Sequence, residues 1–64
     1  MTVYDFVGLI TDPSFQTICV YSLEKEKNVY LGSADRIPAY LQNEEVQSID
    51  TLFNDTVVLT INVD

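Results

Sequence analysis

The stretch from Thr56 to Val63, TVVLTINV, decides the fold, because it is the clearest strand signal in this 64-residue sequence. Successive side chains of a strand point to opposite faces. One face would carry Val57, Leu59, Ile61 and Val63, and the other would carry Val58, Thr60 and Asn62. We therefore predict a strand over residues 56–63 whose aliphatic face covers a hydrophobic core.

A second strand is indicated over Phe15–Ser22, FQTICVYS, which is rich in β-branched and aromatic residues. Simple alternation directs Ile18 and Val20 toward the core. Cys19 and Tyr21 would then lie on the outer face of the sheet.

The segment Leu23–Asn28 is a polar connection of hairpin length, and it predicts that Val29–Leu31 returns as the partner strand. Alternation places Val29 and Leu31 inward. Tyr30 would then lie on the outer face.

The first residues indicate a helix, since Thr2 and Asp5 have the spacing of a capping box with Asp in place of Glu. Val3, Phe6, Val7 and Ile10 then fall on one helical face. The segment is also rich in β formers, so a strand is the competing interpretation, but the cap and the period favour a helix. The dipeptide Asp12-Pro13 ends the element.

A second, short helix is predicted from Pro38 to about Asn43, because proline suits the first turn of a helix. Its buried face would carry Ile37, Tyr40 and Leu41. A third strand, with imperfect alternation, is expected over Val46–Thr51, and a turn at Asn54-Asp55 leads into the last strand.

The predicted order is α-β-β-α-β-β over residues 1–64, one small α+β domain. Two hairpins, each preceded by a helix, favour a two-layer fold with one four-stranded antiparallel sheet and both helices on one face. A core of this size rarely supplies more than about 3–5 kcal/mol without a partner chain, a metal or a disulfide. Cys19 is the only cysteine, which excludes an internal disulfide.

Charge divides the sequence unevenly, and the net charge is −7. All three basic residues lie in 24–36, where acids balance them, whereas residues 37–64 hold acids alone. Such a chain should repel nucleic acid and anionic membranes. No stretch is long and apolar enough for a membrane span and no signal peptide is recognisable, so we expect a cytoplasmic protein.

Catalysis is not indicated, since the sequence has no His and Cys19 has no expected cation beside it. We predict no catalytic, cofactor-binding or metal-ligating residues, no cofactor and no small-molecule substrate. Glu44, Glu45 and Asp50 form a candidate acidic patch for a basic protein partner, for which a solubilising surface is the simpler interpretation.

The outer face of the predicted sheet is unusually apolar. Its candidate interface residues are Cys19, Tyr21, Tyr30 and Val58, with Thr17 and Thr60 beside them. Aromatic side chains with few charges are typical of an interface core. We therefore expect contact with another protein, most simply a second copy in a dimer, with pairing through an edge strand as the alternative geometry.

Short motifs are spread over nearly the whole chain, at Thr2-Val3, Asp5, Asp12–Gln16, Gly32–Asp35, Ile37-Pro38, Glu44–Asp50 and Leu59–Asp64. In these motifs the sequence resembles a set of short acidic proteins of unknown function encoded in bacterial phages and integrated mobile elements. The resemblance implies a shared fold and a mobile-element setting, and it implies no activity. In that setting an alternative function is inhibition of a basic host protein, in one version by imitation of nucleic-acid charge.

Overall fold

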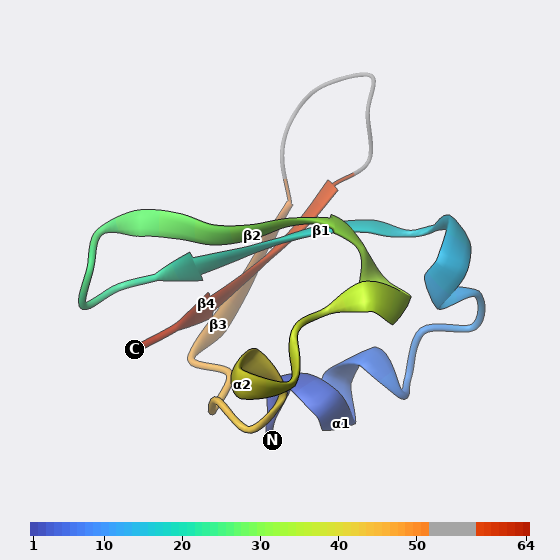
Figure 1. Ribbon diagram of the computed structural model, residues 1–64, viewed down its shortest axis with the longest axis horizontal. Coiled ribbons are helices and arrows are strands. Elements are labelled where there is room, and N and C mark those ends of the chain that lie inside the picture. The colour runs from blue at the N-terminus through green and yellow to red at the C-terminus, as the bar shows by residue number, and fades with distance from the viewer. Residues whose placement is uncertain (52–57) are drawn as a thin grey trace.

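The fold is a mixed α+β arrangement of a four-stranded sheet and two short helices, described by a computed structural model for residues 1–51 and 58–64 (Figure 1). In chain order the elements are α1 (Val3–Val7), η1 (Pro13–Phe15), β1 (Thr17–Ser22), β2 (Lys27–Ser33), η2 (Ala34–Arg36), α2 (Ala39–Gln42), β3 (Ser48–Thr51) and β4 (Val58–Val63). The order α-β-β-α-β-β predicted from the sequence is confirmed. The predicted turn at Asn54-Asp55 and the predicted strand residues Thr56 and Val57 lie outside the described residues.

The sheet has the strand order β2-β1-β4-β3, and it is mixed, so the prediction of a purely antiparallel sheet was wrong. Strand β1 is antiparallel to β2 but parallel to β4, and β3 is antiparallel to β4. The cause is the connection over residues 34–47. It carries the chain from β2 at one edge to β3 at the other, and β4 then returns into the centre beside β1. A parallel pair needs such a crossover, whereas two adjacent hairpins do not produce one.

One hydrophobic cluster joins the helices to the inner face of the sheet. Its buried members are Val3, Ile18, Val20, Ala34, Ile37, Leu41, Ile61 and Val63. They come from α1, η2, α2, the link between η2 and α2, and the two central strands, and both helices lie on the same side of the sheet in Figure 1. The predicted alternation of Ile61 and Val63 with the outer residues of β4 is confirmed.

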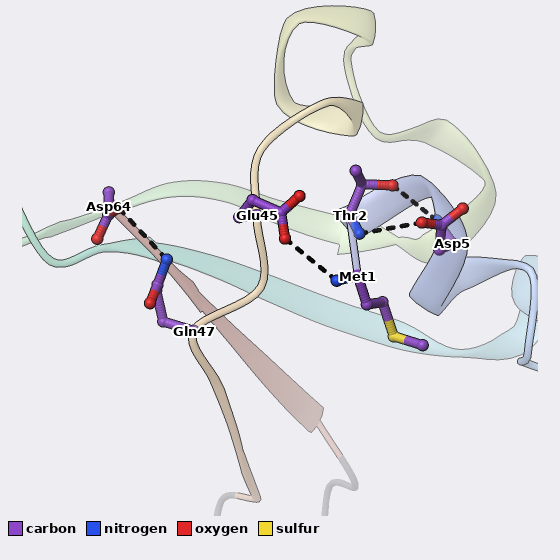
Figure 2. A network of polar contacts seen from close by, with 6 residues as sticks. All are labelled: Met1, Thr2, Asp5, Glu45, Gln47 and Asp64. Carbon is purple, nitrogen blue, oxygen red and sulfur yellow. Dashed lines mark hydrogen bonds and ion pairs between the residues drawn. The ribbon is translucent and has the colours of Figure 1, made fainter.

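Helix α1 begins with the predicted capping box (Figure 2). The backbone N–H of Asp5 donates to Thr2 Oγ1, and the backbone N–H of Thr2 donates to Asp5 Oδ2, both at 3.1 Å. Val3 is fully buried, while Phe6, Val7 and Ile10 pack against the core. The helix ends at Val7, earlier than the apolar period suggests, and a turn carries the chain to Ile10.

The capping box predicts a pH-dependent contribution to stability. Hydrogen bonds to Thr2 hold the pKa of the Asp5 carboxyl below its ordinary value. The bond from the Thr2 backbone N–H has the larger effect, and the bond with the Thr2 side chain adds to it. A lowered folded-state pKa means that this stabilisation is present above the ordinary pKa and is lost as pH falls through the folded one. We expect Asp5→Asn to lower the free energy of unfolding in urea at about pH 7, with the deficit shrinking toward about pH 3.

The control for this prediction is Glu24→Gln, which removes the same charge from an exposed turn away from the helix start. A deficit for Asp5→Asn that stayed constant with pH, or that matched the control at every pH, would contradict the assignment.

Strand β2 departs from the predicted alternation. Val20 pairs with Tyr30 but Tyr21 pairs with Asn28, so a bulge at Val29 shifts the register. As a result Tyr30 lies on the inner face, packed against the core, and the prediction that it lies on the outer face was wrong. Leu31 pairs with Cys19 on the outer face and is 67% exposed, so its predicted inward position was wrong as well.

Two other aromatic side chains differ from the sequence-based expectation. Tyr40, predicted on the buried face of α2, is 70% exposed, whereas Ile37 and Leu41, predicted on the same face, are buried. Phe15, predicted to start β1, belongs to the 3-10 turn η1, and β1 begins at Thr17. Proline at the start of η1 favours the turn and delays the strand.

Candidate interaction surface

The outer face of the sheet is not covered by a second layer among the described residues, since α1, α2 and η2 contribute to the core on the inner side. The register places Cys19 between Leu31 of β2 and Thr60 of β4, and Tyr21 between Asn28 and Asn62. A sheet with one bare face is a surface on which another protein can pack.

A shallow hollow of about 340 Å³ lies on this face, lined by Cys19, Tyr21, Asn28, Asp50, Thr60 and Asn62. Asn62 is buried, and its Nδ2 donates to Ser48 Oγ at 2.9 Å and to Asp50 Oδ2 at 2.8 Å. These bonds tie β4 to β3 across the outer face. The face is therefore more polar on the β3 side than the sequence-based prediction implied.

Cys19 is a packed thiol within this face. It is buried, its Sγ donates to Asn28 Oδ1 at 3.1 Å, and burial raises the pKa of the thiol. A raised pKa lowers the fraction of reactive thiolate near neutral pH. The Cys19 thiol is therefore less reactive at neutral pH than an exposed cysteine.

The structure brings together only part of the candidate interface. Cys19 and Tyr21 share the outer face, and Val58, whose register partner on β1 is Thr17, lies on that face at the start of β4. Tyr30 is separated from them by the sheet. Leu31 takes the place that Tyr30 was expected to hold.

The candidate acidic patch is likewise divided. Glu45 pairs with the Met1 amino group at 3.1 Å, beside an isolated β-bridge between Thr2 and Glu45 (Figure 2). Asp50 accepts from Asn62 on the outer face of the sheet, and Glu44 lines a different hollow. Glu44, Glu45 and Asp50 therefore do not form one continuous patch.

That second hollow, of about 170 Å³, lies between α2 and the β1–β2 hairpin. Its apolar side chains include Val29, Leu41 and Val63. Its charged side chains are Glu24, Glu44 and Asp64, with Lys25 as the cation. Carboxylates therefore outnumber cations among the side chains that line this hollow.

Several kinds of site have no support in the described part of the chain. Residues 1–51 and 58–64 hold no group of three or more His, Cys, Asp or Glu side chains placed to bind a metal ion. Over the same residues, no helix has the length and hydropathy to cross a membrane. Comparison with protein-family models, curated proteins and solved structures finds no significant match to this chain. Over residues 1–51 and 58–64, the fold is a small mixed α+β arrangement whose two helices pack on one face of a four-stranded sheet.

Sequence reasoning missed Leu31 and Asn28 as outer-face residues. Strict alternation cannot show a bulge, because one extra residue reverses the face of every side chain that follows. Gly32 was the residue in the sequence that could have indicated an irregularity in this strand. A glycine inside a strand often marks a close approach, and here the Tyr30 ring lies over it.

Proposed function

We propose that this chain is a small non-enzymatic protein that acts by protein–protein contact and associates with itself through the uncovered side of its sheet. The observation that carries the proposal is Leu31, a large aliphatic side chain left 67% exposed in the middle of a strand, on the face of the sheet opposite to the described helices. Burial of apolar surface of this kind drives most protein association.

Small size supports a second copy as the partner. A core of this length supplies only a few kcal/mol, and a symmetric dimer is the commonest way to add buried surface. The Cys19 thiol beside Leu31 is held in packing and hydrogen bonding, which suits a contact surface.

Sedimentation or light scattering over a range of protein concentrations tests this proposal. We expect the average mass to rise with concentration and to stay raised at high salt, since apolar contacts are not screened. Leu31→Asp should weaken association by more than about tenfold, because a two-fold axis near this residue brings two charges together. Tyr4→Asp, an equally exposed position on α1, is the matched control and should have no effect.

A monomer at every concentration, or equal effects of Leu31→Asp and Tyr4→Asp, would contradict self-association through the sheet.

A second candidate function is binding of a basic host protein, as the mobile-element resemblance suggests. The observation in its favour is the acidic hollow beside α2, whose surplus of carboxylates and apolar lining residues suit a Lys or Arg side chain. Imitation of nucleic-acid charge is less well supported, since Asp5, Glu45 and Asp50 all bond to groups of the chain itself.

Binding of a short Arg-rich peptide tests this second candidate. We expect the peptide to bind, and we expect its affinity to fall with added salt and with Glu44→Gln. Glu26→Gln, in the exposed turn, should leave the affinity unchanged.

A further inference from the structure

We infer that the hollow on the outer face of the sheet is a binding site for the guanidinium group of an arginine side chain on a basic partner protein. The hollow, of about 340 Å³, falls near the lower end of the size range of small-molecule sites. Its lining combines the carboxylate of Asp50 with Tyr21 and Asn62. The inference goes beyond the proposed self-association and does not rest on it, since Leu31 does not line the hollow.

The buried carboxamide of Asn62 presents an unused acceptor to this hollow. Asn62 is 7% exposed, and its Nδ2 donates to Ser48 Oγ at 2.9 Å and to Asp50 Oδ2 at 2.8 Å. An ionised carboxylate only accepts, so the atom facing Asp50 is the nitrogen, and Oδ1 is turned away from β3. No donor among the described residues bonds to Oδ1. Since no side-chain oxygen of those residues is both enclosed and unpaired, Oδ1 is open to the hollow.

Asp50 adds a negative charge that no cation of the described residues offsets. Its Oδ2 accepts from Asn62, and no ion pair within residues 1–51 and 58–64 involves it. The hydrogen bond holds the Asp50 carboxylate and the Asn62 carboxamide next to each other in the lining of the hollow. A cation that carries several N–H donors complements this pair of acceptors, because hydrogen bonds to a charged group are the stronger ones.

A planar guanidinium group fits this arrangement better than an ammonium group. Its N–H donors form a rigid fork that can reach neighbouring acceptors together, and its flat face stacks on aromatic rings. Tyr21, the register partner of Asn62 on β1, is half-buried and offers such a ring beside the amide. A Lys ammonium is more strongly hydrated and has no flat face. Arginine is therefore the side chain that the hollow selects.

Charge favours a separate basic partner over a second copy. The net charge is −7, and residues 37–64, which include Asp50, contain no Lys or Arg. Two copies therefore repel each other at this part of the surface. The single arginine of the chain, Arg36, lies in η2 beside Ala34, which is buried on the helix side of the sheet. Contact between two outer faces would leave Arg36 on the far side of each sheet, away from the hollow.

Titration of the isotope-labelled chain with acetyl-arginine-methylamide, followed by NMR, tests this site. We expect saturable shifts of the backbone amides of Cys19, Tyr21 and Thr60 and of the side-chain amide of Asn62. The corresponding citrulline compound has nearly the same shape but no charge, and it should bind about tenfold more weakly, since the charge-assisted pair is lost. The corresponding lysine compound keeps the charge without the planar fork and should bind about threefold more weakly.

Three variants assign the affinity to named groups. Asp50→Asn should weaken binding of the arginine compound by about tenfold, because it removes the charge and keeps the size of the side chain. Asp35→Asn is the matched control, since it removes the same charge from an exposed position outside the hollow, and it should change the affinity by less than about twofold. Tyr21→Leu removes the ring but stays apolar, and it should cost about threefold. The amide spectrum of each variant reports whether it is folded.

Absence of saturable shifts on the outer face, or equal affinities for the arginine and citrulline compounds, overturns the inference. Equal losses with Asp50→Asn and Asp35→Asn overturn it as well. Shifts around Glu44 in place of Asn62 would assign the arginine to the hollow beside α2 and reject this site. Shifts that grow with protein concentration without ligand, and that Arg36→Gln removes, would put a second copy in the hollow and reject the separate partner. Self-association is read independently, from the average mass.

Discussion

Replacement of Ile61 by alanine is expected to abolish cooperative folding. Ile61 is fully buried at the centre of β4, opposite Val20 on β1 and Ile49 on β3. Truncation of a buried isoleucine to alanine costs about 2–5 kcal/mol, since it removes burial and leaves a cavity. A single core of this size supplies about 3–5 kcal/mol in total. The substitution therefore removes most or all of the stability.

Urea unfolding followed by far-ultraviolet circular dichroism measures this effect. If the alanine variant is already unfolded without urea, Ile61→Val serves in its place. It should cost only about 0.5–1.5 kcal/mol, so that the variant still folds and its unfolding transition can be measured. Ile49→Ala is the matched control, because it is the same substitution at the directly paired position on edge strand β3, where the side chain is 38% exposed. Its cost should be less than half that of Ile61→Ala. Equal costs at the two positions would show that the core is not centred on β4.

The predictions that succeeded depended on local chemistry. The capping box at Thr2 and Asp5 needs only residues three apart, and the alternation around Ile61 needs only one strand. Both signals lie within a few residues of chain. The order of elements followed from such signals, and it was correct.

The predictions that failed depended on contacts distant in sequence. Whether β4 pairs with β1 or with β3 alone is decided by where residues 34–47 cross the sheet, and no local pattern encodes that path. The bulge at Val29 is set by the fit of β2 against β1, and it moved Tyr30 off the candidate interface and Leu31 onto it. One extra residue in a strand thus changed the candidate site more than the mixed sheet did.

Substitution of Gly32 by alanine is expected to destabilise the chain through Tyr30. A Cβ built at Gly32 lies 2.8 Å from Tyr30 Oη and 3.1 Å from Tyr30 Cζ, so the ring must move. Movement breaks the 2.7 Å hydrogen bond from Oη to Ser33 O, worth about 1 kcal/mol, and withdraws part of the ring from the core. Alanine otherwise gains about 0.5–1 kcal/mol over glycine within a strand. The two losses together exceed that gain, and we expect a net cost of about 1–2 kcal/mol.

A double-mutant cycle isolates this contact, because the sign of the Gly32→Ala effect should depend on the ring. In a Tyr30→Ala background the clash is absent, and Gly32→Ala should become neutral or stabilising in urea unfolding. In a Tyr30→Phe background the hydroxyl and its bond are gone but the ring remains, so the cost should fall without changing sign. Additive effects of Gly32→Ala and Tyr30→Ala would mean that the ring does not lie over the glycine.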